Sequence, residues 1–300
     1  MQDRIARQNY DRECRKHYTI AGGKPAKIVE FPHMAALGWK ALDDTWVYLC
    51  GGSLISHKFV LTAAHCTKHK PIRIKTSTPQ IVRLGATNVY GPDVKFNELP
   101  VIKEIKHIIP HPYYKSPKKY FDIALLELKE NVMFTKLVHP ACLMVSSDII
   151  QTQLTATGWG ALGEKKNSSV DLQSTVLDVF NFEQCSNTLS YSYHRNWLRM
   201  RKHQMCAGKM DGSTDTCPGD SGAPLQYNLT EPNFDGNMHV IVGITSFGLG
   251  CARKDTPGIY TKISYFIDWI EAIVWPNYTC INTNNIDGYN LTQMIFFPCN

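Results

Sequence analysis

The chain has 300 residues, of which 19% are charged and 43% are hydrophobic, and its formal net charge is +6. This composition is typical of a globular protein and excludes a disordered chain. Because its basic residues form no long run, we expect no nucleic-acid partner, and we expect the lysine pairs at 118–119 and 165–166 to lie on solvated loops. No apolar run approaches the roughly 18 residues of a membrane-spanning helix, so no membrane segment is predicted.

Residues 1–19 are rich in charge and show no hydrophobic periodicity. The stretch 1–7 also lacks the apolar core of a signal peptide, so we expect this sequence to be a mature or truncated form. From Ile20 onward, short apolar stretches alternate with Gly, Pro, Asn and Asp, which indicates an all-β domain. The clearest predicted strands cover 58–64, 123–128 and 240–244.

A single helix is predicted, late in the chain, over residues 264–274. Phe266, Ile270 and Ile273 would share one face, Ser264 is the expected N-cap, and Pro276 ends the helix. A polar tail follows, which we expect to be held by a disulfide.

The ten cysteines contain no Cys-x-x-Cys pair, so neither a zinc site nor a redox motif is predicted. Disulfides formed in an oxidising compartment are the better interpretation, and they indicate a secreted, extracellular protein. Four Asn-x-Ser/Thr sequons support this and are candidate glycosylation sites: Asn167, Asn228, Asn277 and Asn290.

Three segments, 61–66, 121–126 and 215–225, carry the candidate chemistry through His65, Asp122 and Ser221. A serine hydroxyl is a weak nucleophile at neutral pH, so it needs a base to take its proton and a third group to orient that base. Each residue alone also has an ordinary interpretation: a surface histidine, an aspartate at the start of a strand, and a serine in a turn.

Together with 50–55, 156–160 and 257–261, these segments resemble the chymotrypsin/trypsin-like serine peptidases, over about residues 20–274. Segments 31–39 and 242–248 are similar to the arthropod clip-domain peptidases, which act in extracellular cascades and have relatives in venoms. The resemblance implies two six-stranded Greek-key β-barrels with a C-terminal helix. It also implies three parts: an N-terminal pro or light-chain segment 1–19, a peptidase domain 20–275 with its catalytic cleft between the barrels, and a tail 276–300.

The family's roles fall on matching residues. Ser221 would attack the scissile carbonyl, His65 would act as general base and then general acid, and Asp122 would orient the imidazole. The backbone N–H groups of Gly219 and Ser221 would form the oxyanion hole. The resemblance implies no cofactor and no metal.

The resemblance also implies cleavage after Arg or Lys, because Asp215 takes the position at the floor of the primary pocket. Gly248 and Gly258 match the pocket walls, and Thr216 places a hydroxyl beside Asp215. Ser246 and Gly248 match the strand that pairs with the substrate backbone.

Activation in this family follows a cut that frees a new N-terminus, here Ile20, whose ammonium would pair with Asp220. Most relatives have Arg or Lys before this cut, whereas this chain has Tyr18-Thr19, so a trypsin-like activator is not predicted. The expected partners are protein substrates, an activating protease and a serpin-type inhibitor.

By the same resemblance, four disulfides are expected, and the two remaining cysteines give a fifth: Cys14–Cys142, Cys50–Cys66, Cys185–Cys206, Cys217–Cys251 and Cys280–Cys299. The alternative to a zymogen peptidase is a non-catalytic secreted homologue that acts as an adaptor. Such homologues usually lack the serine, which is present here as Ser221.

Overall fold

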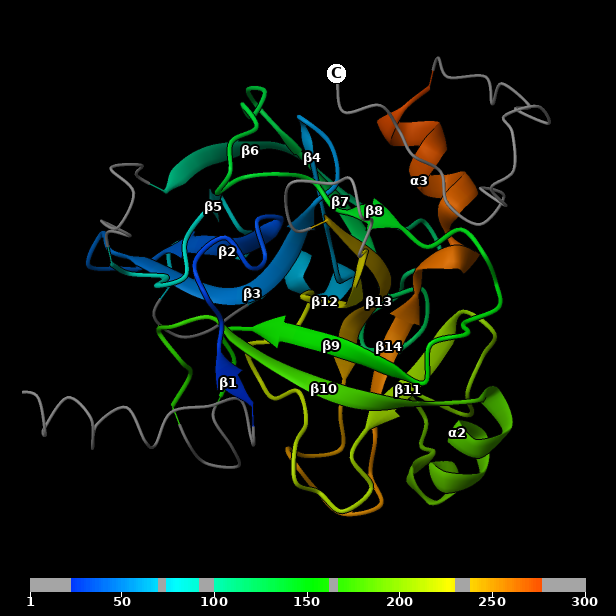
Figure 1. Ribbon diagram of the computed structural model, residues 1–300. Helices are drawn as coiled ribbons and strands as arrows, with labels where there is room; N and C mark the ends of the chain where they lie inside the picture. Colours follow the sequence, from blue (N-terminus) through cyan, green and yellow to red (C-terminus); the bar gives the residue numbers. More distant parts are fainter. Residues whose placement is uncertain (1–22, 70–73, 92–99, 162–166, 230–237, 277–300) are drawn as a thin grey trace, which may run out of the picture.

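The structure is a computed structural model that describes residues 23–69, 74–91, 100–161, 167–229 and 238–276 (Figure 1). These residues are mostly strands arranged as two closed six-stranded antiparallel β-barrels, as the family resemblance implied. Of the expected N-terminal segment 1–19 and tail 276–300, only Pro276 lies within the described residues.

The first barrel closes in the strand order β2-β3-β4-β7-β6-β5. Its strands are β2 (Met34–Lys40), β3 (Trp46–Leu54), β4 (Phe59–Thr62), β5 (Ile81–Leu84), β6 (Val101–Pro110) and β7 (Ala124–Leu128). The pairing of β4 with β7, which joins Thr62 to Ala124, matters most for function. It brings the ends of two strands distant in sequence to one rim of the barrel.

The second barrel follows the order β10-β11-β14-β13-β12-β9 and closes through the pairing of β9 with β10. Its strands are β9 (Gln153–Gly158), β10 (Gln173–Phe180), β11 (Gln204–Gly208), β12 (Pro224–Leu229), β13 (Met238–Phe247) and β14 (Gly258–Lys262). Two short strands add to its outside: β1 (Lys24–Pro25) pairs with β10, and β8 (Cys142–Leu143) pairs in parallel with β13.

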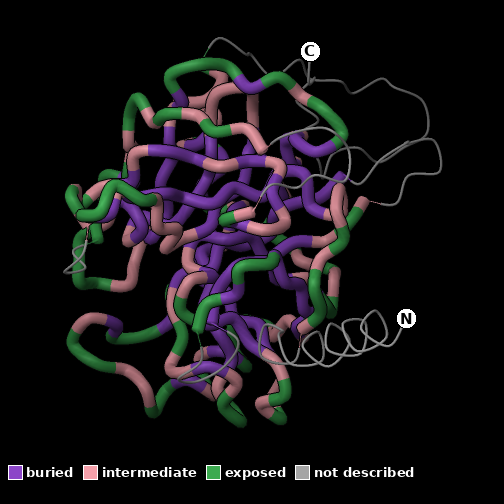
Figure 2. Tube along the Cα trace, turned by 90° about the vertical axis from the view of Figure 1, so that its left-hand side faces the viewer, coloured by how far each residue is buried: buried purple, intermediate pink, exposed green. Residues whose placement is uncertain are grey.

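Most residues on the strands of both barrels are buried (Figure 2). The core of the first barrel includes Trp39 and Leu125, which are fully buried, and it continues to Ile241 and Ile244 of β13. Because one apolar cluster reaches strands of both barrels, burial of this surface holds the barrels against each other.

The predicted C-terminal helix is present as α3 (Ile267–Val274), with Ile270 buried against the core of the first barrel. The expectation that Ser264 caps it is wrong. Ser264 lies inside a 3₁₀ turn, η5 (Ile263–Tyr265), and Phe266 occupies the N-cap position without a side-chain hydrogen bond. The Phe266 ring is buried, so packing of an aromatic side chain fixes the start of this helix in place of a polar cap.

A second helix, α2 (Phe182–Thr188), was not predicted. Asn181 and Gln184 form a capping box, in which Asn181 Oδ1 accepts from the Gln184 amide and Gln184 Oε1 accepts from the Asn181 amide. The spacing of these residues was a readable signal. However, only Cys185 of the helix is buried, so the sequence has no hydrophobic periodicity there that would predict a helix.

Two further 3₁₀ turns, η2 (Ala64–Thr67) and η4 (Ser190–Ser192), complete the described elements. Over the described ranges, no helix combines the length and the apolar character needed to cross a bilayer.

The buried core gives a stability prediction. Leu125→Ala should lower the free energy of unfolding by about 2–5 kcal/mol, because it leaves a cavity in a closely packed barrel. Leu42→Ala makes the same chemical change at a side chain that is 60% exposed, and it should cost far less. Urea unfolding followed by tryptophan fluorescence measures both, and equal losses would contradict the assigned core.

Candidate active site

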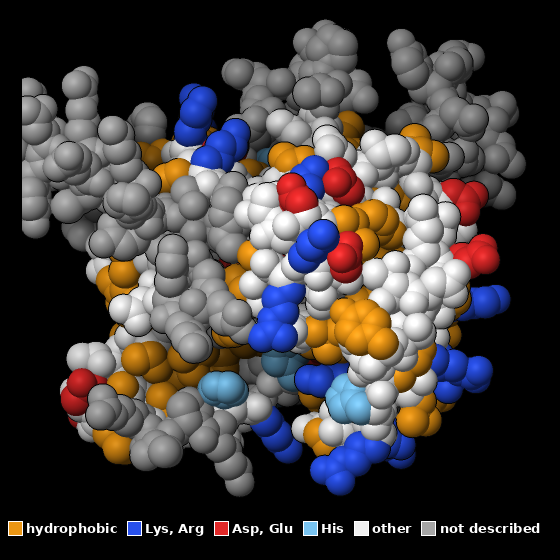
Figure 3. Space-filling view, turned by 90° about the horizontal axis from the view of Figure 1, so that it is seen from below, with side chains coloured by type: hydrophobic (Ala, Val, Ile, Leu, Met, Phe, Trp, Pro, Cys, Tyr) orange, Lys and Arg blue, Asp and Glu red, His pale blue; other side chains and the backbone are white. Residues whose placement is uncertain are grey.

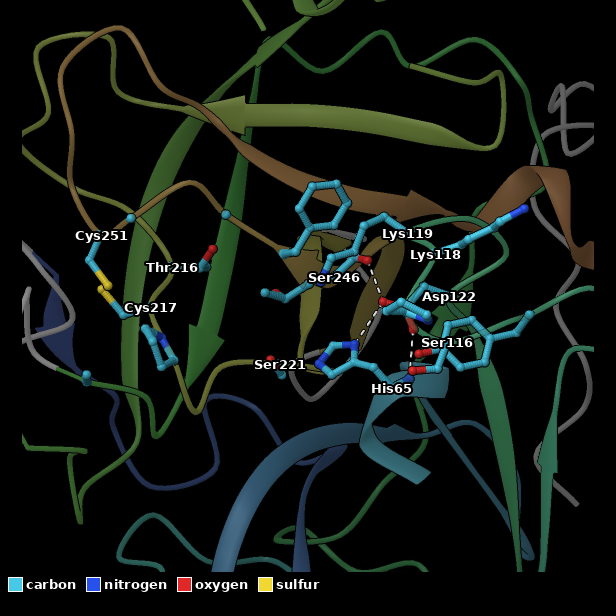
Figure 4. A pocket seen from close by; sticks show the side chains of 18 of the residues that line it. His65, Ser116, Lys118, Lys119, Asp122, Thr216, Cys217, Ser221, Ser246 and Cys251 are labelled. Carbon is cyan, nitrogen blue, oxygen red and sulfur yellow. Dashed lines mark hydrogen bonds and ion pairs between the residues drawn. The ribbon is translucent and has the colours of Figure 1, made fainter. Parts of the chain in front are cut away.

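A cleft of about 670 Å³ is lined by residues of both barrels and contains His65, Asp122 and Ser221 (Figure 4). His65 lies in η2, immediately after β4, and Asp122 lies just before β7. Ser221 precedes β12 in the second barrel. The figure shows the imidazole of His65 lying between Asp122 and Ser221. The three residues that the sequence singled out are therefore brought together by the fold.

The backbone around His65 is fixed on two sides. The Cys50–Cys66 disulfide, one of the expected pairs, ties the residue after His65 to β3. The hydroxyl of Thr62, at the end of β4, donates to the carbonyl of Gly51 on β3 at 2.8 Å. His65 itself is only partly buried, so its imidazole is held at the edge of the cleft and remains open to it.

Asp122 is buried and holds His65 with both carboxylate oxygens. The His65 amide donates to Oδ1 and the imidazole Nδ1 lies beside Oδ2, each at 2.8 Å. The Ser246 hydroxyl donates to Oδ2 at 2.5 Å from the other barrel. Burial alone would raise the pKa of Asp122, but the charge of His65 and the hydrogen bonds from His65 and Ser246 lower it below its usual value. The carboxylate is thus kept ionised.

The residue before Asp122 has a strained backbone. Phe121 has a φ of 55°, which is uncommon for a bulky side chain. Its ring stacks on His203 at 4.5 Å and on His111 at 5.2 Å between centroids. This packing compensates for the strained turn, and the turn directs the Asp122 carboxylate toward His65.

The backbone near Ser221 adopts conformations that require glycine. Gly222 has a φ of 79°, and a Cβ there would collide with the Thr62 hydroxyl. Gly219 has a φ of 101°, and a Cβ there would lie 2.8 Å from Gly160 Cα. Within the part of the chain that the structure describes, the amides of Gly219 and Ser221 donate to no protein acceptor. They are free to donate to a ligand.

Asp215 lies beside the cleft and is almost completely buried. Its carboxylate accepts from the Thr216 amide at 2.8 Å and from the Ala252 amide at 3.3 Å. Burial raises the pKa of Asp215 to about 7, because the described residues place no basic side chain against it. A Cβ on Gly258 would lie 3.2 Å from Asp215 Oδ1, so the glycine keeps the approach to this carboxylate open.

Asp220 is a second buried carboxylate, with Oδ1 accepting from the Gly160 amide at 2.7 Å and Oδ2 from the Cys217 amide at 2.9 Å. Burial raises its pKa to about 6 despite these hydrogen bonds. The expected partner of Asp220, the ammonium of Ile20, lies outside the described residues.

The other predicted site residues divide into those near the cleft and those outside the described part. Thr216, Ser246 and Gly248 line the cleft. The sequons at Asn167 and Asn228 have exposed side chains, whereas those at Asn277 and Asn290 lie outside the described residues.

The cysteine predictions are met to different degrees. Cys185–Cys206 forms a disulfide, as expected. Cys217 and Cys251 are buried next to each other, and contact with Cys251 together with burial raises the pKa of Cys217 (Figure 4). Their bond stays a prediction. Cys142 is described but Cys14 is not, and the pair Cys280 and Cys299 also lies outside the described residues.

Sequence reasoning gave no role in the cleft to several of the residues that line it, among them Tyr114, Lys118, Lys119 and Phe247. The two lysines were expected on a solvated loop, but that loop forms a wall of the cleft (Figure 4). Burial, with a smaller effect of Asp122, raises the pKa of Tyr114 to about 12, so this phenol stays neutral. The proximity of the lysine pair to Asp122 in the sequence was the available signal.

One group of described side chains has metal-ligand character, formed by Cys50, His65 and Cys66. Both sulfur atoms of this group are used in the Cys50–Cys66 disulfide. It therefore lacks the thiolate ligands that a metal site would need.

A sequence model of the trypsin family matches residues 20–270, which includes both barrels and the cleft. The chain belongs to the trypsin family of serine endopeptidases. Among its relatives, it is 39% identical to serine protease snk of Drosophila melanogaster over 85% of this chain, and 37% identical to serine protease Hayan of the same species over 86%. It is also 34% identical to venom serine protease Bi-VSP of Bombus ignitus over 84% of this chain and 67% of the relative.

The two Drosophila relatives are much longer than this trypsin-family chain. It spans 57% of snk and 41% of Hayan, or about half the length of these relatives. The match therefore concerns only part of each of these relatives.

The raised pKa of Asp215 gives a pH prediction. Benzamidine, a small cation, should bind about tenfold more weakly at pH 6 than at pH 8, because protonation of a group with a pKa of about 7 removes the negative charge that the cation needs. Isothermal titration calorimetry at the two pH values measures this. Asp215→Asn should bind weakly at both, and a wild-type affinity that does not change with pH would contradict the prediction.

Proposed function

We propose that residues 20–275 form the catalytic domain of a secreted serine endopeptidase that cuts peptide bonds after Arg or Lys through an acyl-enzyme. The observation that carries this proposal is the arrangement in the cleft. A buried, ionised Asp122 holds His65 at 2.8 Å, and the His65 ring faces Ser221 (Figure 4). Among the described residues, the amides of Gly219 and Ser221 have no protein acceptor.

In the first half of the reaction, Ser221 Oγ attacks the carbonyl carbon while His65 Nε2 takes the hydroxyl proton. The carbonyl oxygen becomes an oxyanion, to which the amides of Gly219 and Ser221 donate. Asp122 stabilises the imidazolium through the hydrogen bond at Nδ1. His65 then donates its proton to the departing amine as the C–N bond breaks, which leaves an ester on Ser221.

In the second half, a water molecule attacks this ester and His65 takes one of its protons. Collapse of the second tetrahedral intermediate returns that proton to Ser221 Oγ and releases the carboxylic acid. No cofactor or metal is needed, because the three side chains and the backbone amides supply every proton transfer and charge contact.

Selectivity for Arg or Lys is supported by the buried charge of Asp215. The carboxylate has hydrogen bonds from two amides but no cation among the described residues, and Gly258 leaves space beside it. A substrate guanidinium or ammonium would provide the missing charge. An apolar side chain would leave the carboxylate without compensation and would therefore bind less well.

Activation by a cut between Thr19 and Ile20 is supported by Asp220. This carboxylate is fully buried, and burial raises its pKa to about 6, so an ammonium placed beside it would be strongly stabilised. Since Asp220 directly precedes Ser221, the ion pair would fix the backbone of the oxyanion hole.

The setting we propose is extracellular, in a proteolytic cascade or a venom. The disulfides of the described part support an oxidising compartment, and the relatives include a venom protease. The partners would be protein substrates, an activating protease that cuts after Thr19, and a serpin-type inhibitor.

Substitution of the nucleophile tests the activity. The chain cut at Thr19–Ile20 should hydrolyse an Arg-ended amide, and Ser221→Ala should lower kcat by about 10⁶-fold. Asp122→Asn should lower it by about 10⁴-fold, because the imidazole loses its orientation. Ser213→Ala, a substitution in a nearby turn, should keep wild-type rates. No turnover by the cut wild-type chain would favour the non-catalytic adaptor.

The dependence on the cut is tested separately. A chain with an enteropeptidase site ending at position 19 should be nearly inactive until it is cut, and activity should appear with the free Ile20 amine. Asp220→Asn should stay nearly inactive after the same cut, since the ammonium then lacks its partner. Equal activity before and after the cut would contradict the zymogen proposal.

A further inference from the structure

Lys119 lies on the wall of the cleft, next to the strand end expected to bind substrate backbone. Its ammonium is 5.1 Å from the centroid of the Phe247 ring. Phe247 stands at the end of β13, between Ser246 and Gly248. Figure 4 shows Lys119 beside Ser246, whereas the Lys118 side chain extends away from Ser221. A substrate paired with 246–248 would therefore pass this ammonium.

The backbone of Lys119 is well anchored. Its amide donates to the carbonyl of Asn196 at 3.1 Å, and its carbonyl accepts from Gln204 Nε2 at 2.8 Å. The next residue, Tyr120, accepts at its hydroxyl from the amides of Leu198 and Arg199. The ammonium is thus presented from a fixed loop, and the ring of Phe247 shields it from water on one side.

Within the described ranges, no carboxylate is paired with the lysines of this wall. Among the described residues, no ion pair includes Lys118 or Lys119. The Asp122 carboxylate in the same cleft is paired with His65, and the other eight ion pairs lie outside the cleft lining. The adjoining segment 194–202 contains no acidic residue. It adds four basic residues: Arg195, Arg199, Arg201 and Lys202.

The surface view fits this excess of positive charge. In Figure 3, Lys and Arg side chains gather along the lower part of the face shown, while most acidic side chains lie higher. A positive field beside a cleft attracts anionic ligands and repels basic ones.

We propose that Lys119 forms an anion-binding subsite, which selects substrates with an Asp or Glu side chain at one position shortly before the basic residue at the cut. The inference rests on the proposed function, because it deepens the specificity of the same cleft. The substrate carboxylate would accept hydrogen bonds from the Lys119 ammonium above the Phe247 ring. Recognition would then need two charges of opposite sign in the substrate: a cation for Asp215 and an anion for Lys119.

The subsite should be confined in position. Side chains of an extended peptide point alternately to opposite faces, so neighbouring substrate residues cannot all face Lys119. An acidic residue should therefore help at one position, or at alternate positions, and not equally at all of them. A general attraction by the basic surface would help at every position.

The test compares peptides that end in Arg at the cut. Asp or Asn, and Glu or Gln, are placed singly at each of the three residues before the Arg, and kcat/KM is measured with the cut full-length chain. At the favoured position, wild type should prefer the acid over its amide by about three- to tenfold, as expected for one partly exposed charge pair. The preference should shrink as salt is raised.

Substitution locates the effect. Lys119→Gln should bring the ratio of kcat/KM for each acid peptide to kcat/KM for its amide peptide down to about one at the favoured position. The matched control is Lys136→Gln, which removes the same charge from an exposed residue that does not line the cleft. It should keep the preference. Equal rates for acid and amide peptides in wild type, or an equal loss in both variants, would overturn the proposal while the peptidase function stands.

Binding separates this proposal from the catalytic one. Ser221→Ala removes the nucleophile, so the affinity of fluorescent acid and amide peptides can be compared without turnover. Tighter binding of the acid peptide, lost on adding Lys119→Gln, would support the subsite even if the wild-type chain hydrolysed no peptide. Equal affinities would overturn it in either case.

Discussion

The site depends on the hydrogen bonds that the buried carboxylate of Asp122 accepts. Asp122 lies just before β7 of the first barrel, and it accepts from His65 of that barrel and from Ser246 of the second. Its backbone carbonyl accepts from the Thr261 hydroxyl of β14, at 2.8 Å. A buried charge is stable only when such donors surround it. Satisfying this one aspartate therefore fixes the barrels against each other and orients the imidazole in the same step.

At the two other buried carboxylates, hydrogen bonds do not offset the effect of burial on the pKa. Asp215 and Asp220 have hydrogen bonds from backbone amides but no basic side chain against them among the described residues, and burial raises both pKa values. A cation from outside the described residues would therefore stabilise the ionised form of each carboxylate. In the proposed function, the cation for Asp215 comes from the substrate and the cation for Asp220 is the amino group of Ile20. Specificity and activation would then be two uses of the same physical condition.

The positive charge of Lys119 at the cleft wall would favour substrates that also carry a negative charge. Lys119 stands over the ring of Phe247, which is the last residue of the strand where substrate is expected to pair. Its position follows from the loop before Asp122, whose backbone is tied to the segment 194–202 of the second barrel. The loop that places the triad aspartate thus also places the lysine.

Sequence alone determined the all-β class, the C-terminal helix and the three segments with His65, Asp122 and Ser221. Short apolar stretches between turn residues, helical spacing and the glycines on either side of Ser221 are local properties that single segments display. Only the tertiary structure placed Lys119 and Phe247 in the cleft, gave Phe121 its stacking partners, and started α3 at a buried Phe266. These depend on which distant residues meet when the barrels close, and on how much water is then excluded from Asp122, Asp215 and Asp220. No local pattern encodes that burial.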